Sequence, residues 1–260
     1  MVTALGRIAL SLLQYLGELA LLAYETCTAM LVAPIRWRLF SRQIVEVGWR
    51  SQLVVIVTGA FTGAVLTAQT YFQFAALGMK SATGSVVAVA IFRELGPVLT
   101  GLMVAGRVGA AIAAEIGTMK VTEQIDALRS LAVHPIDYLV VPRVLALVLS
   151  MPLLVAESVG LAIVASYIVG VNLLGISGPF FLGNLYRYVG PRDIKMALCK
   201  GFCFAVVIAF VSCHQGLNAK EGAVGVGRAP TEAVVISSLA ILILNFFLTF
   251  LLNMLFPYGS

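Results

Sequence analysis

The chain has 260 residues, of which 60% are hydrophobic and 11% are charged, and its net charge is +5. A soluble domain carries about 25% charged residues, so this composition leaves no stretch for a soluble enzyme domain. Lysine and arginine nowhere reach the density of a nucleic-acid site, and we expect no nucleic-acid partner. Long apolar runs in this composition predict an all-α integral membrane protein.

The first segment carries a narrow polar stripe at helical spacing. Its members are Arg7, Ser11, Gln14, Glu18 and Glu25. Because apolar residues occupy the remaining positions, the pattern predicts an amphipathic helix that lies in the membrane interface over about 5–24. We assign residues 1–45 to this interfacial segment. A sixth spanning helix is the alternative, and polar residues in the middle of the segment weaken it.

Five later segments are long and apolar enough to cross a bilayer. They are Leu53–Phe74, Gly84–Ala105, Val144–Val169, Ile194–Cys213 and Val234–Phe256. Arginine and lysine are concentrated before the first span and in the second loop, which places the N-terminus in the cytoplasm and the C-terminus outside. No repeat or interdomain linker is visible, so we expect one domain over 1–260.

Two ionised side chains, Arg93 and Glu94, lie in the middle of the second span. A charge at this depth costs roughly 2.5–3.5 kcal/mol and faces a bundle interior or a wet cavity. Adjacent residues point about 100° apart on a helix, so each must find partners elsewhere. Pro97 removes the hydrogen bond to the carbonyl of Arg93, which predicts a kink and a free acceptor there.

Polar residues of other spans reach the same depth. At about 1.5 Å per residue, Lys200 and Asn245 lie in the layer of Arg93. Glu94 is the one carboxylate that we expect in this layer, so two cations and one anion leave an excess of +1. Either Lys200 loses its proton or an anion such as a phospholipid head group balances it. Asn245→Asp is then expected to stabilise the protein, and Glu94→Gln to destabilise it.

This polar layer has two compatible interpretations. It is the floor or gate of a substrate cavity, or an ion network that fixes helix packing. The first interpretation makes the chain a transporter subunit.

The second loop contains a short amphipathic helix over about 121–131. Its candidate docking residues for a soluble partner are Glu123, Gln124, Asp126, Leu128 and Arg129. A surface helix that rests on the bilayer is the alternative. His134 and Pro135 end the segment.

The glycine-rich segment 215–230 has no phosphate-binding G-x-x-x-x-G-K-[ST] pattern, and we expect a tight loop. No such pattern occurs elsewhere in the chain, so an ATP-driven transporter would need its ATPase on another polypeptide. The four cysteines and two histidines have no metal-ligand spacing, and we expect no metal site and no cofactor in this chain.

Two stretches resemble the MlaE/YrbE family of permeases, the membrane subunits of ABC systems that move lipids together with MCE proteins. The first runs from Arg93-Glu-Leu-Gly-Pro through Ala105-Gly-Arg-Val-Gly to Glu123-Gln-Ile-Asp-Ala-Leu. The second contains Gly222-Ala-Val-Gly-Val-Gly and Ala233-Val-Val-Ile-Ser. The resemblance covers about 45–252.

The resemblance implies a homodimer of five-span subunits in the bacterial inner membrane, with an N-terminal interfacial helix. It implies a coupling helix at about 121–131 seated on an ABC ATPase, which binds ATP and Mg²⁺. It also implies an MCE-domain partner outside, often a small STAS-domain protein, and phospholipid as substrate. The family's charged cluster maps onto Arg93, Glu94 and Lys200, and its usual aspartate is Asn245 here.

A second functional reading comes from another class. An ion- or proton-coupled secondary carrier could use Glu94 as its titrating group. An ATPase that copurifies with the chain distinguishes the first reading from this one. A purely structural anchor would tolerate loss of charge at Arg93 and Glu94.

Overall fold

The computed structural model describes residues 2–32, 36–220 and 222–256, and every regular element in this part of the chain is helical. The first half contains α1 (Val2–Val32), α2 (Trp37–Val47), η1 (Trp49–Ser51), α3 (Gln52–Ala76), η2 (Lys80–Ala82), α4 (Thr83–Ala90), η3 (Ile91–Leu95), α5 (Gly96–Val104), η4 (Ala105–Gly109), α6 (Ala110–Val121) and α7 (Gln124–Ser130). The second half contains η5 (Ile136–Val140), α8 (Val141–Tyr167), η6 (Ile168–Leu173), α9 (Gly178–Tyr188), α10 (Pro191–Leu217) and α11 (Ala223–Leu255).

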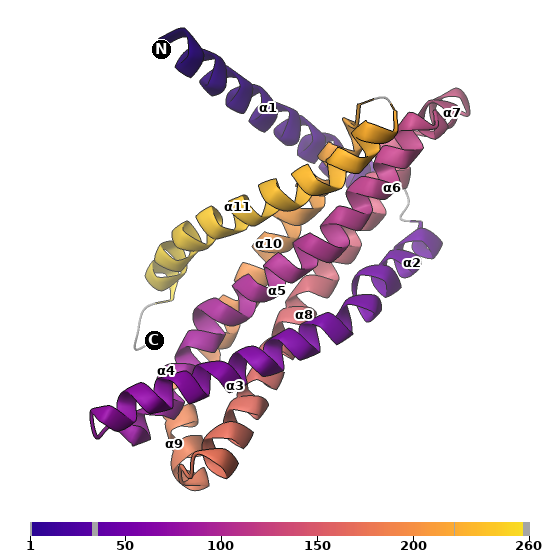
Figure 1. Cartoon of the computed structure of the whole chain (residues 1–260). Coiled ribbons are helices and arrows are strands. Elements are labelled where there is room, and N and C mark those ends of the chain that lie inside the picture. The colour runs from indigo at the N-terminus through magenta and orange to yellow at the C-terminus, as the bar shows by residue number, and fades with distance from the viewer. Residues whose placement is uncertain (1, 33–35, 221, 257–260) are drawn as a thin grey trace.

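The long helices form one elongated bundle, from which α1 projects at an angle (Figure 1). The helices α4, α5 and α6 follow one another as a single rod of 39 residues, joined by the π-helical turns η3 and η4. In the same way α2, η1 and α3 make a continuous helical run of 40 residues. Both runs are longer than the roughly 20 residues that cross a bilayer, so these helices continue beyond the membrane segments predicted from the sequence.

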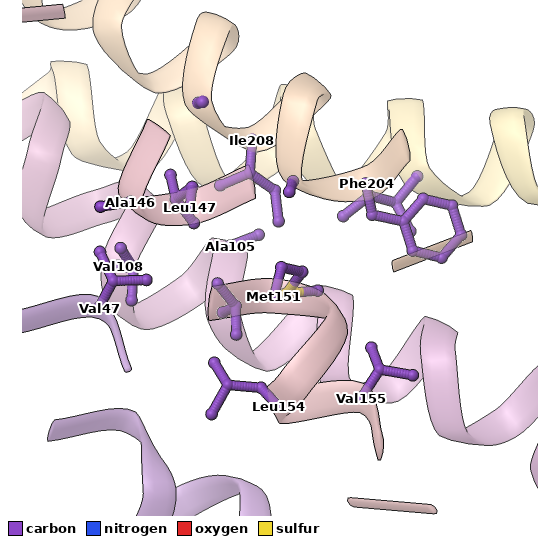
Figure 2. Packing of buried hydrophobic residues seen from close by; sticks show 14 of the residues in the cluster. Val47, Ala105, Val108, Ala146, Leu147, Met151, Leu154, Val155, Phe204 and Ile208 are labelled. Carbon is purple, nitrogen blue, oxygen red and sulfur yellow. The ribbon is translucent and has the colours of Figure 1, made fainter. Parts of the chain in front are cut away.

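Helices α8 and α10 form the centre of the bundle. In the most apolar part of each span, 67% of the α8 residues are buried, compared with 17% for α11. Figure 2 shows part of this core, to which α8 contributes Leu147 and Met151 and α10 contributes Phe204 and Ile208. The helices α3 and α11 cover it on the outside and keep one apolar face open.

Small residues bring α3 against α8. A Cβ atom on Gly59 would lie 2.7 Å from the carbonyl oxygen of Ser158, and one on Gly63 would overlap Ala162. The hydroxyl of Ser166 donates to the carbonyl of Gly63 at 3.1 Å. A G-x-x-x-G spacing of this kind allows two membrane helices to approach at backbone distance.

The all-α membrane architecture is confirmed, and three local expectations change. The predicted interfacial helix extends to Val32, and α1 is also long and apolar enough from Leu13 onward to be a sixth candidate span. The glycine-rich segment 215–230 is helical at both ends, since α10 continues to Leu217 and α11 begins at Ala223. The loop prediction was wrong there because glycine weakens an isolated helix, whereas packing of α11 on α6 and α10 compensates for that cost.

Candidate functional site

The backbone around Arg93 is widened into the π-helical turn η3, which ends where Pro97 opens α5. Proline cannot donate to the carbonyl of Arg93, so the predicted free acceptor exists. The structure also shows what occupies it, because the Lys200 Nζ donates to this oxygen at 2.6 Å. π-helical turns inside longer helices are frequent at functional sites.

Lys200 of α10 has no solvent-exposed surface, yet all three of its donors have partners. Besides the Arg93 carbonyl, its Nζ reaches the Thr249 hydroxyl at 2.8 Å and the Glu94 carboxylate at 3.0 Å. A buried ammonium is tolerated when it is paired and fully hydrogen-bonded in this way. Lys200 thus ties η3 to both α10 and α11.

Glu94 is the hub of this network on the α11 side. Its Oε2 accepts from the Asn245 amide at 2.8 Å, and its Oε1 lies 2.9 Å from the Thr249 hydroxyl and 3.0 Å from Lys200. The side chain of Glu94 still keeps 39% of its surface exposed. We call Arg93, Glu94, Asp193, Lys200, Asn245 and Thr249 the ion cluster.

The expected excess of one positive charge was wrong. Arg93 does not pair with Glu94; its Nε donates to the carboxylate of Asp193 at 2.6 Å, and the Asp193 side chain is only 4% exposed. The ion cluster therefore contains two cations and two carboxylates and is formally neutral. Asn245 acts as a donor to Glu94 and does not leave a cation unpaired.

Sequence reasoning missed Asp193 and Thr249 for different reasons. Asp193 lies one residue before the predicted start of the fourth span and was assigned to a loop. It caps the N-terminus of α10, where its carboxylate accepts from the Gly190 N–H at 2.9 Å, and a carboxylate in a first helical turn was the available signal. Thr249 lies four residues after Asn245 on the same helix face, which the helical period could have revealed.

The short helix that the sequence predicts as a docking element, at about 121–131, is shorter than expected. It comprises α7, and Glu123 precedes it in a left-handed conformation with φ of 58°. Ile125 is buried and Leu128 half-buried, whereas Glu123, Gln124, Asp126 and Arg129 are exposed. Arg129 pairs with Asp126 on α7 at 3.0 Å. The helix therefore presents polar side chains outward at the end of the bundle where α6 stops (Figure 1).

The same end of the molecule joins α1 to the bundle. Glu18 of α1 contacts His214 of α10, with 3.0 Å between Oε2 and Nε2, and the ring of Tyr15 packs edge-on against the imidazole at 4.9 Å between centroids. A cavity of about 980 Å³ lies beside this contact, between α1, α7 and the end of α10. His214 thus anchors the N-terminal helix.

A polytopic helical bundle with a buried ion network and an exposed terminal helix is typical of a transporter's membrane subunit. The family model of the MlaE permease matches residues 40–251. The chain is 42% identical over 246 residues to a probable ABC transporter permease protein of Rickettsia felis, covering 95% of both chains. The chain therefore belongs to the MlaE permease family.

Two further relatives extend the comparison. A probable ABC transporter permease protein of Synechocystis is 43% identical over 210 residues, which cover 81% of this chain and 80% of the relative. The chloroplastic protein TRIGALACTOSYLDIACYLGLYCEROL 1 of Arabidopsis thaliana is 38% identical over 229 residues, covering 88% of this chain and 65% of the relative. The Rickettsia felis and Synechocystis relatives are both named as probable permeases of ABC transporters.

Proposed function

We propose that this chain, as one permease domain, moves phospholipid or a related lipid between the bacterial inner membrane and an MCE-protein conduit. A separate ABC ATPase binds ATP and Mg²⁺ and drives the movement, and a STAS-domain protein joins the complex. The family membership supports the ATPase, and the Arabidopsis relative carries the name of a glycolipid. The arginine bias supports a cytoplasmic N-terminus and a periplasmic C-terminus.

One observation supports a lipid substrate: the ion cluster reaches the surface at the partly exposed carboxylate of Glu94, and α3 and α11 expose apolar side chains. Exposed apolar side chains of α3 include Phe61 and Val65, and those of α11 include Leu242 and Phe246. In a homodimer that brings these faces together, acyl chains would contact apolar walls while the head group meets the polar ion cluster. Large apolar side chains that are exposed along two outer helices of the bundle support a contact with lipid or with a second subunit.

The secondary-carrier reading is less well supported. A carrier needs a carboxylate that exchanges its proton with each side in turn. Glu94 instead holds Lys200, Asn245 and Thr249 together, so its protonation would dismantle contacts among three helices.

Charge reversal at α7 tests the ATPase-driven mechanism. We expect Glu123→Arg to abolish copurification of the ATPase, or lipid-stimulated ATP hydrolysis. The permease should stay folded in the membrane, because Glu123 is exposed. Lys80→Glu at the opposite end of the bundle is the matched control and should leave both unchanged. Normal copurification and normal hydrolysis in Glu123→Arg would exclude α7 as the coupling element.

A further inference from the structure

A groove of about 550 Å³ lies between α2 and the rod formed by η4 and α6, and no residue of the ion cluster lines it. One wall is apolar, where Val47 and Val108 lie side by side (Figure 2) and Ala111, Ile112 and Ala114 continue the surface. The polar edge of the groove contains Gln43, Glu46, Arg107, Glu115 and Thr118. Volumes of this size are typical of small-molecule sites.

Arg107 is held in place at the polar edge. Its Nη1 donates to the Ser51 hydroxyl at 2.6 Å and to the Glu46 carbonyl at 3.3 Å. Its Nη2 lies 4.0 Å from the Glu46 carboxylate, which is beyond hydrogen-bond distance, and 31% of the side chain remains exposed. A guanidinium that is fixed on one side and open on the other is suited to bind a phosphate.

The two carboxylates at the groove are already neutralised from outside it. Arg50 pairs with Glu46 at 2.7 Å, and Arg143 pairs with Glu115 at 2.5 Å. Arg42 lies next to the Glu115–Arg143 pair in an adjoining small cavity. Four arginines and two glutamates therefore leave a local charge of +2, so that an anion at Arg107 meets net attraction.

Two tryptophans mark the depth of the groove. Trp37 opens α2 and Trp49 follows it, and the side chains of both are 71% exposed. They are the chain's only tryptophans. Exposed tryptophan is enriched at the head-group level of a bilayer. The groove between them and α6 is therefore at the depth where lipid phosphates lie.

We propose that the groove between α2 and α6 binds an anionic phospholipid of the cytoplasmic leaflet, the side on which the arginines of the chain are concentrated. Its phosphate contacts Arg107 and its acyl chains follow the wall formed by Val108, Ala111 and Ile112. Basic pockets between membrane helices on the cytoplasmic side bind such head groups. No residue of the ion cluster lines the groove. On the function proposed above, this lipid therefore occupies a site separate from that of the lipid that the permease moves.

The test uses the full-length chain with its copurified subunits, reconstituted in nanodiscs of phosphatidylcholine with or without phosphatidylglycerol. The readouts are phosphatidylglycerol retained per protomer after detergent exchange and the Tm. We expect Arg107→Gln to lower retention about tenfold, since it removes a charge-assisted hydrogen bond. Ala111→Phe should lower it similarly by filling the groove without changing any charge.

Arg38→Gln is the matched control, because Arg38 is an exposed arginine of α2 that does not line the groove. It should retain phosphatidylglycerol as the unaltered chain does. Retention in Arg107→Gln and Ala111→Phe equal to that of the unaltered chain would overturn the proposal. Should Arg107→Gln fail to fold, Ala111→Phe decides alone. A Tm increase with inorganic phosphate in phosphatidylcholine discs, equal to that with phosphatidylglycerol, would show an anion site and overturn the assignment to lipid.

Discussion

At the scale of single residues, Lys200 and Glu94 have most of the hydrogen bonds of the ion cluster. The ammonium of Lys200 donates to three acceptors, and the two carboxylate oxygens of Glu94 contact Lys200, Asn245 and Thr249. Replacing one partner of a buried ion pair leaves an uncompensated charge, so the cost exceeds what the pair itself contributed. Each member of the ion cluster is therefore expected to be intolerant of conservative changes.

Asn245→Asp is expected to destabilise the protein, in contrast to the expectation from the sequence. The substitution exchanges a donor to Glu94 for a second carboxylate, and the ion cluster has no excess cation to balance it. Asn253→Asp on the same helix is the control for an added carboxylate. Its side-chain oxygen keeps accepting from Arg192 at 2.7 Å, and the variant loses only the hydrogen bond that the Asn253 amide donates to the Thr249 carbonyl at 2.7 Å. The measurement is the Tm of both variants in detergent; a Tm increase for Asn245→Asp alone would contradict the neutral ion cluster.

Asp193→Asn tests the partner that the sequence did not reveal. Arg93 would lose its contact with the Asp193 carboxylate while its side chain remains largely buried, and breaking a buried ion pair costs up to roughly 3–5 kcal/mol. We expect a clear fall in Tm and reduced lipid bound per protomer. Arg187→Gln, an exposed arginine near the end of α9, should leave the Tm within error. If Asp193→Asn and Arg187→Gln melt alike, the Arg93–Asp193 pair does not hold η3 to α10.

At the scale of helices, the contact between α3 and α8 depends on the absence of side chains. Gly63→Ala would drive a methyl group into the backbone of Ala162, and overpacking of this kind costs about 1–3 kcal/mol. Gly160→Ala on α8 is the control, since no atom lies within 4 Å of its added Cβ and alanine favours the helix. In thermal unfolding, the Tm of Gly63→Ala should fall and that of Gly160→Ala should rise, relative to the unaltered chain. Equal Tm values for the two variants would mean that α3 and α8 are not closely packed.

The placement of α1 relative to the membrane is a second question at this scale. Its polar stripe and its departure from the bundle favour an interfacial position (Figure 1). In a background lacking the native cysteines, Ser11→Cys and Glu18→Cys should react with an impermeant reagent from the cytoplasmic side only. Lys80→Cys should react from the outside and verify the sidedness. Labelling of Ser11→Cys from outside would make α1 a sixth span.

At the scale of the whole molecule, the open faces of α3 and α11 predict a homodimer. A Phe61→Cys and Phe246→Cys double variant in a cysteine-free background should form a disulfide-linked dimer in membranes, because both side chains are exposed on those faces. Leu153→Cys is equally exposed, but it lies on α8 and not on the open faces of α3 and α11, and it should stay monomeric. Cross-linking of Leu153→Cys, with none in the double variant, would place the interface elsewhere.

The sequence alone determined the membrane class, the place of Arg93 and Glu94 within a long apolar helix, the carbonyl that Pro97 leaves without an N–H donor, and the position of the short helix α7. Hydropathy, charge bias and the lack of a proline donor act within one helix or one turn, so a local pattern contains them. It also placed Lys200 and Asn245 in the layer of Glu94, because depth follows from counting residues along a helix.

Only the tertiary structure decided which side chains pair. Arg93 and Asp193 are separated by 100 positions in the sequence, and their contact depends on how η3 meets the first turn of α10. The charge of the ion cluster changed from +1 to neutral through this one contact. The groove between α2 and α6 likewise exists only because two distant segments pack with a gap, for which no local sequence pattern provides a signal.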